Sequence, residues 1–218
     1  WGQTIDSGNH SCPVGSYCPA GSELPLACPP GKYNPSQQKG IVNECLDCTP
    51  GYYCEQYNMS SPSGYCNEGF YCLRGASTPN PMSVYTDVVS GNLVGGGICV
   101  EGTYCPEGSP YPYNCPHGTY NNLLQQGSCF QCPAGYYCSG NVTDFEEYEC
   151  PAGYYCPNGT SHSTEFPCPE GTYNNLTLRE SLADCHNAPP GFYAEGITNV
   201  YADGQCAAGY YCPRASTS

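Results

Sequence analysis

The recurring apolar positions of this chain belong to a short motif, Cys-x-x-Gly-x-Tyr, rather than to long helices or strands. Leu, Ile, Val and Phe together make up only 28 of the 218 residues, about 13%, whereas Cys alone supplies 20. Below roughly 20% of those four residue types, a chain normally cannot bury enough apolar area to fold. Disulfides must therefore replace an ordinary core. With 27 Gly and 22 Pro, we expect small disulfide-rich tandem repeats, mostly irregular, with short β-hairpins.

The motif occurs eleven times, and every copy keeps its Gly and its Tyr. A Pro after the opening Cys, as at Pro13, Pro133 and Pro151, presets the φ of a turn, and the Gly can adopt the positive φ that closes it. The Tyr ring is expected to cover the disulfide while its hydroxyl stays in water. We number the copies motif 1 to motif 11 by their glycines: Gly15, Gly31, Gly51, Gly69, Gly102, Gly118, Gly135, Gly153, Gly171, Gly191 and Gly209.

The residue that follows the motif Tyr, here called the closing position, predicts how the cysteines pair. In motif 10 the opening and closing positions are both alanine, Ala188 and Ala194, so both cysteines are absent together, as expected if they bond to each other. A crossed pattern remains open, because spacing alone does not fix connectivity. Seven pairs are predicted across a motif: Cys12/Cys18, Cys48/Cys54, Cys66/Cys72, Cys99/Cys105, Cys132/Cys138, Cys150/Cys156 and Cys206/Cys212. Three motifs close with Asn34, Asn121 or Asn174, and there the predicted pairs are Cys28/Cys45, Cys115/Cys129 and Cys168/Cys185.

The order of the motifs predicts an array of larger units. After a lead-in, the spacing of the first unit returns twice, and it is interrupted by a truncated unit. Such an array is expected to form an elongated rod in which each unit touches only its neighbours. The predicted segments are the lead-in 1–11, repeat one 12–65, a truncated repeat 66–98, repeat two 99–149, repeat three 150–205 and the start of a further repeat 206–218.

Residues 78–98 are an insert that matches no other segment. Val84, Tyr85, Val88 and Val89 are β-branched or aromatic and suit a strand, a turn is expected at 90–92, and the three glycines at 95–97 suggest a flexible stretch. A hairpin with an exposed edge could pair with another subunit. The alternative is a spacer or loop.

Charge and cysteine usage limit the classes of partner. Nineteen acidic residues against five basic ones give a net charge of −14, which disfavours nucleic acid and anionic membranes. Twenty cysteines persist as disulfides only in an oxidising compartment, which predicts a secreted or cell-surface protein. No run of 18 apolar residues is present, so no membrane insertion is expected within this segment. A start at Trp1 suggests a processed protein or a piece of a longer one.

We find no pattern of catalytic, metal or cofactor chemistry. The spacing of Cys45/Cys48 and Cys129/Cys132 resembles half a zinc site, but no second pair of ligands follows. Redox chemistry of the Cys-x-x-Cys type is not expected either, because no βαβ pattern surrounds these cysteines. The four histidines fall in different loops, and no hydrolase, metalloprotease or nucleotide-binding motif is present. An acidic cluster could bind calcium weakly, but its residues do not have the spacing of an EF-hand loop. The residues considered were His10, His117, His162 and His186, and the acidic cluster Asp144, Glu146 and Glu147.

Five Asn-x-Ser/Thr triplets predict covalent glycans, since such triplets in loops of a secreted chain are acceptors for N-glycosylation. The glycans would give a solubilising coat to a chain with few charged residues. The predicted sites are Asn9, Asn58, Asn141, Asn158 and Asn175.

The segments Cys-Pro-Ala-Gly-Tyr-Tyr-Cys at 132–138 and 150–156, with Cys-Pro-x-Gly-Thr-Tyr-Asn-Asn at 115–122 and 168–175, resemble the ephrin-receptor-like cysteine-rich repeat. This repeat is similar in style to tumour-necrosis-factor-receptor and EGF-like modules. Long arrays of it are typical of protist and algal surface proteins, including the ciliary hairs called mastigonemes. The resemblance implies a structural or adhesive role with no catalytic residues, and the alanines of motif 10 depart from its pattern.

Two hypotheses about function follow. The first is an extracellular structural protein, a glycosylated, disulfide-stapled rod that forms a filament, a ciliary hair or a surface coat together with copies of itself or other coat proteins. The second is the ligand-binding or adhesive ectodomain of a cell-surface receptor. An enzyme is not expected.

Overall fold

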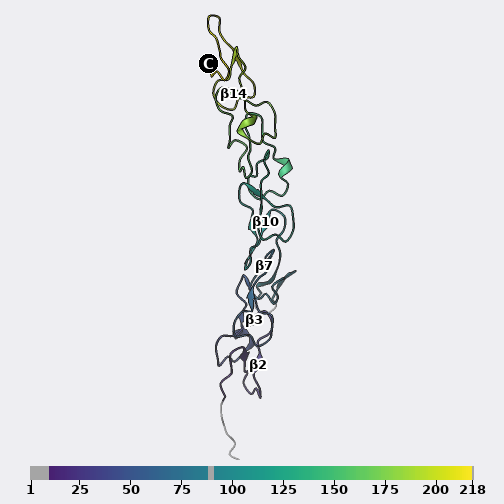
Figure 1. The fold of residues 1–218 in the computed structure, drawn as a ribbon. Helices are drawn as coiled ribbons and strands as arrows, with labels where there is room; N and C mark the ends of the chain where they lie inside the picture. The colour runs from purple at the N-terminus through teal and green to yellow at the C-terminus, as the bar shows by residue number, and fades with distance from the viewer. Residues whose placement is uncertain (1–9, 88–90, 218) are drawn as a thin grey trace, which may run out of the picture. The chain divides into compact units, whose positions relative to one another are not determined.

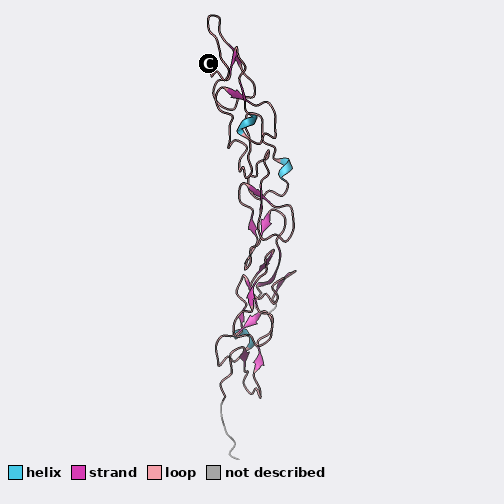
Figure 2. Ribbon diagram, in the orientation of Figure 1, coloured by secondary structure: helices cyan, strands magenta, loops and turns pink. Residues whose placement is uncertain are grey.

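The computed structural model describes residues 10–87 and 91–217, and these form two compact units. Each unit consists of short antiparallel hairpins joined by turns, and regular helices are limited to single turns of 3-10 type (Figures 1 and 2). The chain is thus a set of small disulfide-rich tandem repeats. Among the described residues, unit 1 comprises 10–87, 91–99, 105–112 and 124–127, and unit 2 comprises 100–104, 113–123 and 128–217.

Cys105 shows how the two units divide the chain. The order of the motifs predicts this residue in repeat two (99–149), whereas the structure places it in unit 1. The physical reason is its bonding. Cys105 is disulfide-bonded to Cys99, as predicted, and its carbonyl accepts from Gly69 N–H at 2.8 Å. Its own N–H donates to the Gln126 carbonyl at 2.8 Å, and Cys99, Gly69 and Gln126 all belong to unit 1. The repeats predicted from the order of the motifs and these compact units are different divisions of the chain, and the repeat boundaries stay a prediction.

Each hairpin pairs a motif Tyr strand with the residues just before the next motif. In unit 1 the pairs are β1 (Ser16–Tyr17) with β2 (Leu26–Ala27), β3 (Lys32–Tyr33) with β4 (Leu46–Asp47), and β5 (Tyr52–Tyr53) with β6 (Gly64–Tyr65). In unit 2 they are β10 (Thr103–Tyr104) with β11 (Tyr113–Asn114), β12 (Thr119–Tyr120) with β13 (Phe130–Gln131), β14 (Thr172–Tyr173) with β15 (His186–Asn187), and β16 (Phe192–Tyr193) with β17 (Gly204–Gln205). Motifs 7 and 8 keep only single bridges, Tyr136 to Glu149 and Tyr154 to Pro167.

The motif glycines all adopt positive φ, between 75° and 91°, as the sequence predicts. This conformation turns the backbone so that each motif exchanges four backbone hydrogen bonds with the next one. The same four bonds recur along the described motifs within each unit. Between motifs 1 and 2 they run from Gly15 N–H to Asn34 C=O (2.8 Å), Cys28 N–H to Gly15 C=O (2.9 Å), Cys18 N–H to Lys39 C=O (2.8 Å) and Gln38 N–H to Cys12 C=O (2.9 Å).

A second restraint on the motif glycines is space, and the sequence alone did not indicate it. A Cβ placed on Gly31 would lie 2.5 Å from the carbonyl oxygen of Gly75, and one on Gly153 would lie 2.6 Å from that of Thr198. Both carbonyls belong to the loop two motifs further along the chain. Contacts within each unit therefore extend from a motif to its second neighbour.

The insert adds β8 (Val84–Thr86) and β9 (Leu93–Ile98) to β7 (Phe70–Cys72), so that β9 lies between β7 and the edge strand β8 in a three-stranded sheet of unit 1. The expectation of a flexible stretch at Gly95–Gly97 is wrong. These glycines lie in the central strand, and a Cβ on Gly96 would collide with the Tyr71 carbonyl oxygen. Close approach of neighbouring backbones, not freedom of movement, explains the run of glycines.

Three single-turn 3-10 helices are present in the described loops: η1 (Val42–Glu44), η2 (Phe145–Glu147) and η3 (Leu182–Asp184). Glu44 and Asp184 stabilise the first turns of η1 and η3, since their carboxylates accept hydrogen bonds from backbone N–H groups that precede the helix. Asp144 caps η2 by accepting from Glu146 N–H at 3.0 Å. This contact gives one member of the acidic cluster a structural role.

Candidate functional site

All twenty cysteines are disulfide-bonded, in the ten pairs that the closing positions and the joint loss in motif 10 predict, and none is free. Cys45 bonds to Cys28, and Cys48 to Cys54, so the half zinc site suggested by their spacing has no free thiolate. Ten disulfides are typical of a protein that folds in an oxidising, extracellular-type compartment.

Aromatic rings pack on the disulfides and on one another. In unit 2, Tyr120, Tyr136 and Phe145 pack against the buried Cys132/Cys138 bond. Phe145 meets the two tyrosine rings edge-on, with ring centroids 4.7 and 5.0 Å apart. The rings thus provide the apolar area that the scarce aliphatic residues cannot.

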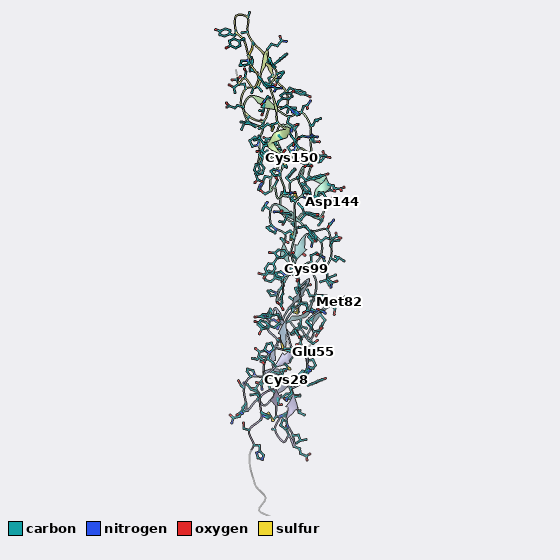
Figure 3. The ribbon with its side chains drawn as sticks, in the orientation of Figure 1. Cys28, Glu55, Met82, Cys99, Asp144 and Cys150 are labelled. Atoms are coloured by element: carbon teal, nitrogen blue, oxygen red, sulfur yellow. A yellow bond between two sulfur atoms is a disulfide. The ribbon has the colours of Figure 1, made fainter. Side chains whose placement is uncertain are left out.

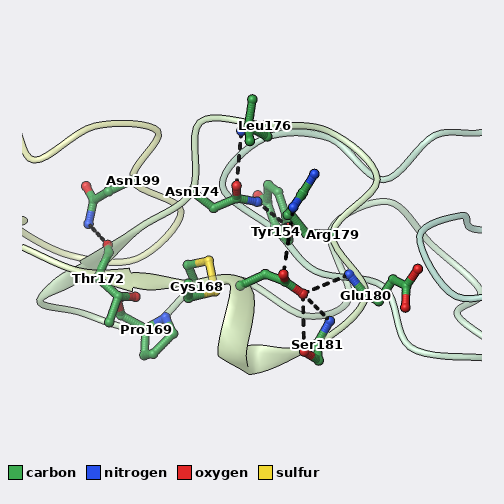
Figure 4. The surroundings of a disulfide bond; sticks show 12 residues. Tyr154, Cys168, Pro169, Thr172, Asn174, Leu176, Arg179, Glu180, Ser181 and Asn199 are labelled. Carbon is green, nitrogen blue, oxygen red and sulfur yellow. Dashed lines mark hydrogen bonds and ion pairs between the residues drawn. A yellow bond between two sulfur atoms is a disulfide. The ribbon is translucent and has the colours of Figure 1, made fainter.

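Three motifs replace the closing cysteine by a buried asparagine. Asn174 donates from Nδ2 to the Tyr154 carbonyl at 3.0 Å and accepts at Oδ1 from Leu176 N–H at 3.0 Å (Figure 4). Asn34 and Asn121 make the same two bonds, and all three side chains are at most 1% exposed. In the three Asn-closed motifs, the amide joins two consecutive motifs where other motifs have a disulfide.

Motif 10 has neither a cysteine nor an asparagine at its closing position, Ala194. Here Asn199, five residues further on, donates from Nδ2 to the Thr172 carbonyl at 3.4 Å (Figure 4). Thr172 follows the glycine of motif 9, which is the acceptor position that the closing asparagines use. Asn199 is 8% exposed. It therefore supplies from a different place the bond that a closing asparagine would make.

Four of the predicted glycosylation sites are exposed, and each lies in the loop that follows a closing position: Asn58, Asn141, Asn158 and Asn175. Asn58 accepts from Ser16 Oγ at 2.7 Å, and Asn158 accepts from Ala134 N–H at 2.8 Å. In both cases the side-chain oxygen makes the bond, which is compatible with a glycan on the nitrogen. Asn9 lies outside the described residues.

The predicted assembly strand is β8, and it lies at the edge of its sheet. Val84 and Tyr85 are 41% and 54% exposed, and Met82 (Figure 3) and Leu93 beside them are 75% and 60% exposed. Val88 and Val89, also assigned to this strand, lie outside the described residues. Other exposed apolar side chains occur elsewhere in the described residues, but those at β8 lie beside an unpaired strand edge.

A pocket of about 280 Å³ lies beside the insert in unit 1, between the β3–β4 and β8–β9 hairpins. Lys32 Nζ contacts Asp47 Oδ1 there and lies 3.7 Å from Asp87 Oδ2. Tyr85 and Val94 line the same pocket. The Lys32–Asp87 ion pair ties the insert hairpin to motif 2, and Lys32, Asp47, Asp87 and Tyr85 bring charged and aromatic groups to the pocket.

His117 and His162 come together in unit 2, although their places in the sequence gave no sign of it. Their rings stack with centroids 5.2 Å apart and planes 14° from parallel. The sequence places these residues in different loops, and the fold brings the two loops together. Knowledge that each motif contacts its second neighbour would have predicted this histidine pair, because that contact places Gly118 against Gly159.

His10 and His186, by contrast, are not part of this pair. Within residues 10–87 and 91–217, no group of three or more His, Cys, Asp or Glu side chains is arranged to hold a metal ion. The helices of the described part are single turns, and none has the length or apolarity to cross a membrane.

No protein-family model matches the chain, and no curated protein is significantly similar to it. The repeat resemblance and the function therefore remain proposals.

Proposed function

We propose that this chain is a structural protein of an extracellular filament, ciliary hair or surface coat, and that copies associate through the edge of β8. The proposal joins the disulfide-stapled array with the resemblance to the ephrin-receptor-like repeat. The observation that carries it is the exposed edge strand in the one insert that departs from the repeat. Glycans on the exposed asparagines would keep the remaining surface in water.

The backbone geometry of β8 supports pairing with a second copy. Asp87 N–H donates to Asn92 C=O, and Gly96 N–H donates to Ser83 C=O. Because inward and outward backbone groups alternate along an antiparallel strand, Val84 and Thr86 direct theirs away from β9. Two copies related by a two-fold axis at Tyr85 would pair Val84 of each with Thr86 of the other. Such an interface is self-complementary.

The exposed side chains also favour a second copy of the chain as the partner of the β8 edge. Met82, Val84 and Leu93 lie on one face beside that edge, because residues two apart along a strand share a face and Thr86 pairs with Leu93. A second copy would cover this apolar group and pair the free edge at once. A monomer would leave both in water, which is unfavourable for an unprotected edge.

The test is sedimentation velocity and electron microscopy of the oxidised chain over a range of concentrations. We expect concentration-dependent assemblies that Val84→Lys abolishes, because a charge on the edge opposes pairing. Leu26→Lys is the matched control, since Leu26 is also a half-exposed strand residue of unit 1, at 47%. A chain that stays monomeric throughout, or assemblies that survive Val84→Lys, would overturn the proposal.

The pocket at Lys32 favours a second candidate, the ligand-binding ectodomain of a receptor. Three charged side chains and the Tyr85 ring around about 280 Å³ suit a small polar ligand such as a sugar. A monomeric chain that binds a glycan array, and loses that binding in Lys32→Met, would support it over the filament.

A further inference from the structure

The stacked pair His117/His162 stands where two turns of unit 2 are held in contact. Gly118 N–H donates to the Cys138 carbonyl at 2.8 Å, and Gly159 N–H donates to the Cys132 carbonyl at 2.8 Å. These bonds and the contact of Gly118 with the Gly159 carbonyl bring the two loops together. Both imidazoles remain exposed to solvent. The backbone therefore presents two accessible rings side by side.

A hydrogen-bond chain fixes which nitrogen of His162 is free. Glu165 Oε2 accepts from Ser161 N–H and from Ser161 Oγ, both at 2.8 Å. As a carboxylate, Glu165 can only accept hydrogen bonds. Ser161 Oγ gives its proton to Glu165 and can only accept from His162 Nδ1, which lies 2.9 Å away. The neutral ring then carries its proton on Nδ1, and Nε2 keeps a free lone pair.

This order of groups differs from that of a hydrolase. In a catalytic triad the serine hydroxyl donates to the histidine and the carboxylate holds the histidine. Here the serine lies between the carboxylate and the ring, so Ser161 is not activated as a nucleophile. The arrangement is instead the one found behind metal-binding histidines, whose second nitrogen donates to a carboxylate, a carbonyl or a similar acceptor.

We propose that His117 and His162 form a binding site for a divalent transition metal ion of the class that prefers imidazole, with Cu²⁺ bound more tightly than Ni²⁺ or Zn²⁺. A metal–nitrogen bond spans about 2.0–2.1 Å, so the 5.2 Å between the ring centroids lets one ion bind both exposed rings, provided that they tilt out of their parallel stack toward it. Water completes the coordination. Every cysteine is disulfide-bonded, so no thiolate of the chain competes for the ion.

The site also makes a structural prediction. His117 belongs to motif 6, and His162 follows motif 8, so a shared ion links a motif to its second neighbour. Neither histidine belongs to the β8 sheet or lies close to it in the sequence. The test of the metal site is therefore independent of the proposed filament.

The experiment uses the full oxidised chain, titrated with CuCl₂, NiCl₂ or ZnCl₂, with MgCl₂ as a hard-ion control. Calorimetry gives affinity and stoichiometry, and paramagnetic broadening of the histidine NMR signals by Cu²⁺ gives the location. We expect one ion per chain, with selective broadening of His117 and His162. His117→Asn and His162→Asn should each lower the Cu²⁺ affinity at least tenfold, whereas the control His186→Asn leaves it unchanged.

A further variant tests the hydrogen-bond chain while both ligands stay in place. Ser161→Ala removes the acceptor of the Nδ1 proton, and we expect the affinity to fall by about tenfold. Equal broadening of all four histidines, or an affinity unchanged in His117→Asn, would overturn the site. An unchanged affinity in Ser161→Ala would overturn the positioning role of Ser161. Non-reducing peptide mapping confirms that each variant keeps its disulfides.

Discussion

Motif 8 and motif 10 of unit 2 follow the same backbone path, although only one of them is closed by a disulfide. Cys150 and Cys156 are bonded in motif 8, whereas Ala188 and Ala194 occupy these positions in motif 10. Both alanines are fully buried, and Gly191 N–H still donates to the Cys212 carbonyl at 3.0 Å. The path is therefore set by the backbone bonds and the glycine conformation, not by the sulfur bridge.

The magnitudes agree with this comparison. Each backbone hydrogen bond contributes about 1 kcal/mol net, so the four between consecutive motifs outweigh the roughly 2 kcal/mol of one short-loop disulfide. What the disulfide adds is a restraint on the unfolded chain. Asparagine closures and Asn199 add side-chain bonds to the native state instead. The same backbone geometry is thus stabilised by a disulfide, by a closing asparagine or by Asn199, depending on the motif.

The largest effect is expected from a motif glycine. Gly31→Ala places a Cβ against the Gly75 carbonyl and forces a non-glycine residue to φ 82°. We expect a loss of about 3 kcal/mol in the free energy of unfolding, from the left-handed strain and the clash together. Denaturant titration of the oxidised chain measures it.

Gly21→Ala is the matched control for Gly31→Ala. Gly21 has φ 81° and no heavy atom within 4 Å of an added Cβ, so it reports left-handed strain alone, about 1 kcal/mol. Equal losses in the two variants would show that the contact between second-neighbour motifs does not restrict the motif glycines.

The double variant Cys150→Ala/Cys156→Ala converts motif 8 into the type of motif 10. We expect a loss of about 2 kcal/mol, while the amide protection of Gly135, Gly153 and Cys168 is retained. Hydrogen exchange checks the path, and denaturant titration checks the free energy. Cys150→Ala/Cys156→Asn should recover about 1 kcal/mol through the closing amide. Loss of protection throughout motifs 7 to 9 would mean that the disulfide does set the path.

A single asparagine closure should show a similar, slightly smaller effect. Asn121→Ala removes a bond to the Thr103 carbonyl at 2.6 Å and one from Leu123 N–H at 3.0 Å. Leaving these partly buried groups unpaired costs about 1.5 kcal/mol. The neighbouring exposed residue gives the control, since Asn122→Ala should change the free energy of unfolding by less than about 0.5 kcal/mol. Similar values for the two variants would contradict a role for the buried amide.

The repeat, the turn glycines and an even set of paired cysteines could be predicted because each leaves a local mark in the sequence. The joint loss at Ala188 and Ala194 even indicated which cysteines pair. The His117/His162 stack, the role of Asn199 and the central position of Gly95–Gly97 could not be predicted. They arise from contacts between motifs that are not adjacent in sequence, or from an insert with no second copy to compare. Position within the motif carries the fold, whereas departures from the motif carry the candidate sites.

The smallest expected effect is a difference between the three long disulfide loops in how their stability depends on pH. In the loop of Cys28 to Cys45, backbone N–H groups of Gly40 and Ile41 lower the pKa of Glu44. In the loop of Cys168 to Cys185, burial opposes the ionisation of Asp184, but bonds from Ser181 and Glu180 outweigh it and the pKa is lowered.

Because both pKa values are depressed in the folded state, the stabilisation is complete above the ordinary carboxyl pKa of about 4 and is lost as the pH falls through the folded values. We expect the protection factors of the Gly40 and Ser181 amides to fall below about pH 4, whereas the loop of Cys115 to Cys129, which has no 3-10 turn capped in this way, keeps its protection. Hydrogen exchange between pH 6 and 3 measures this difference. Glu44→Gln should remove the pH dependence of the first loop only, and an unchanged profile in that variant would show that another group controls the loop.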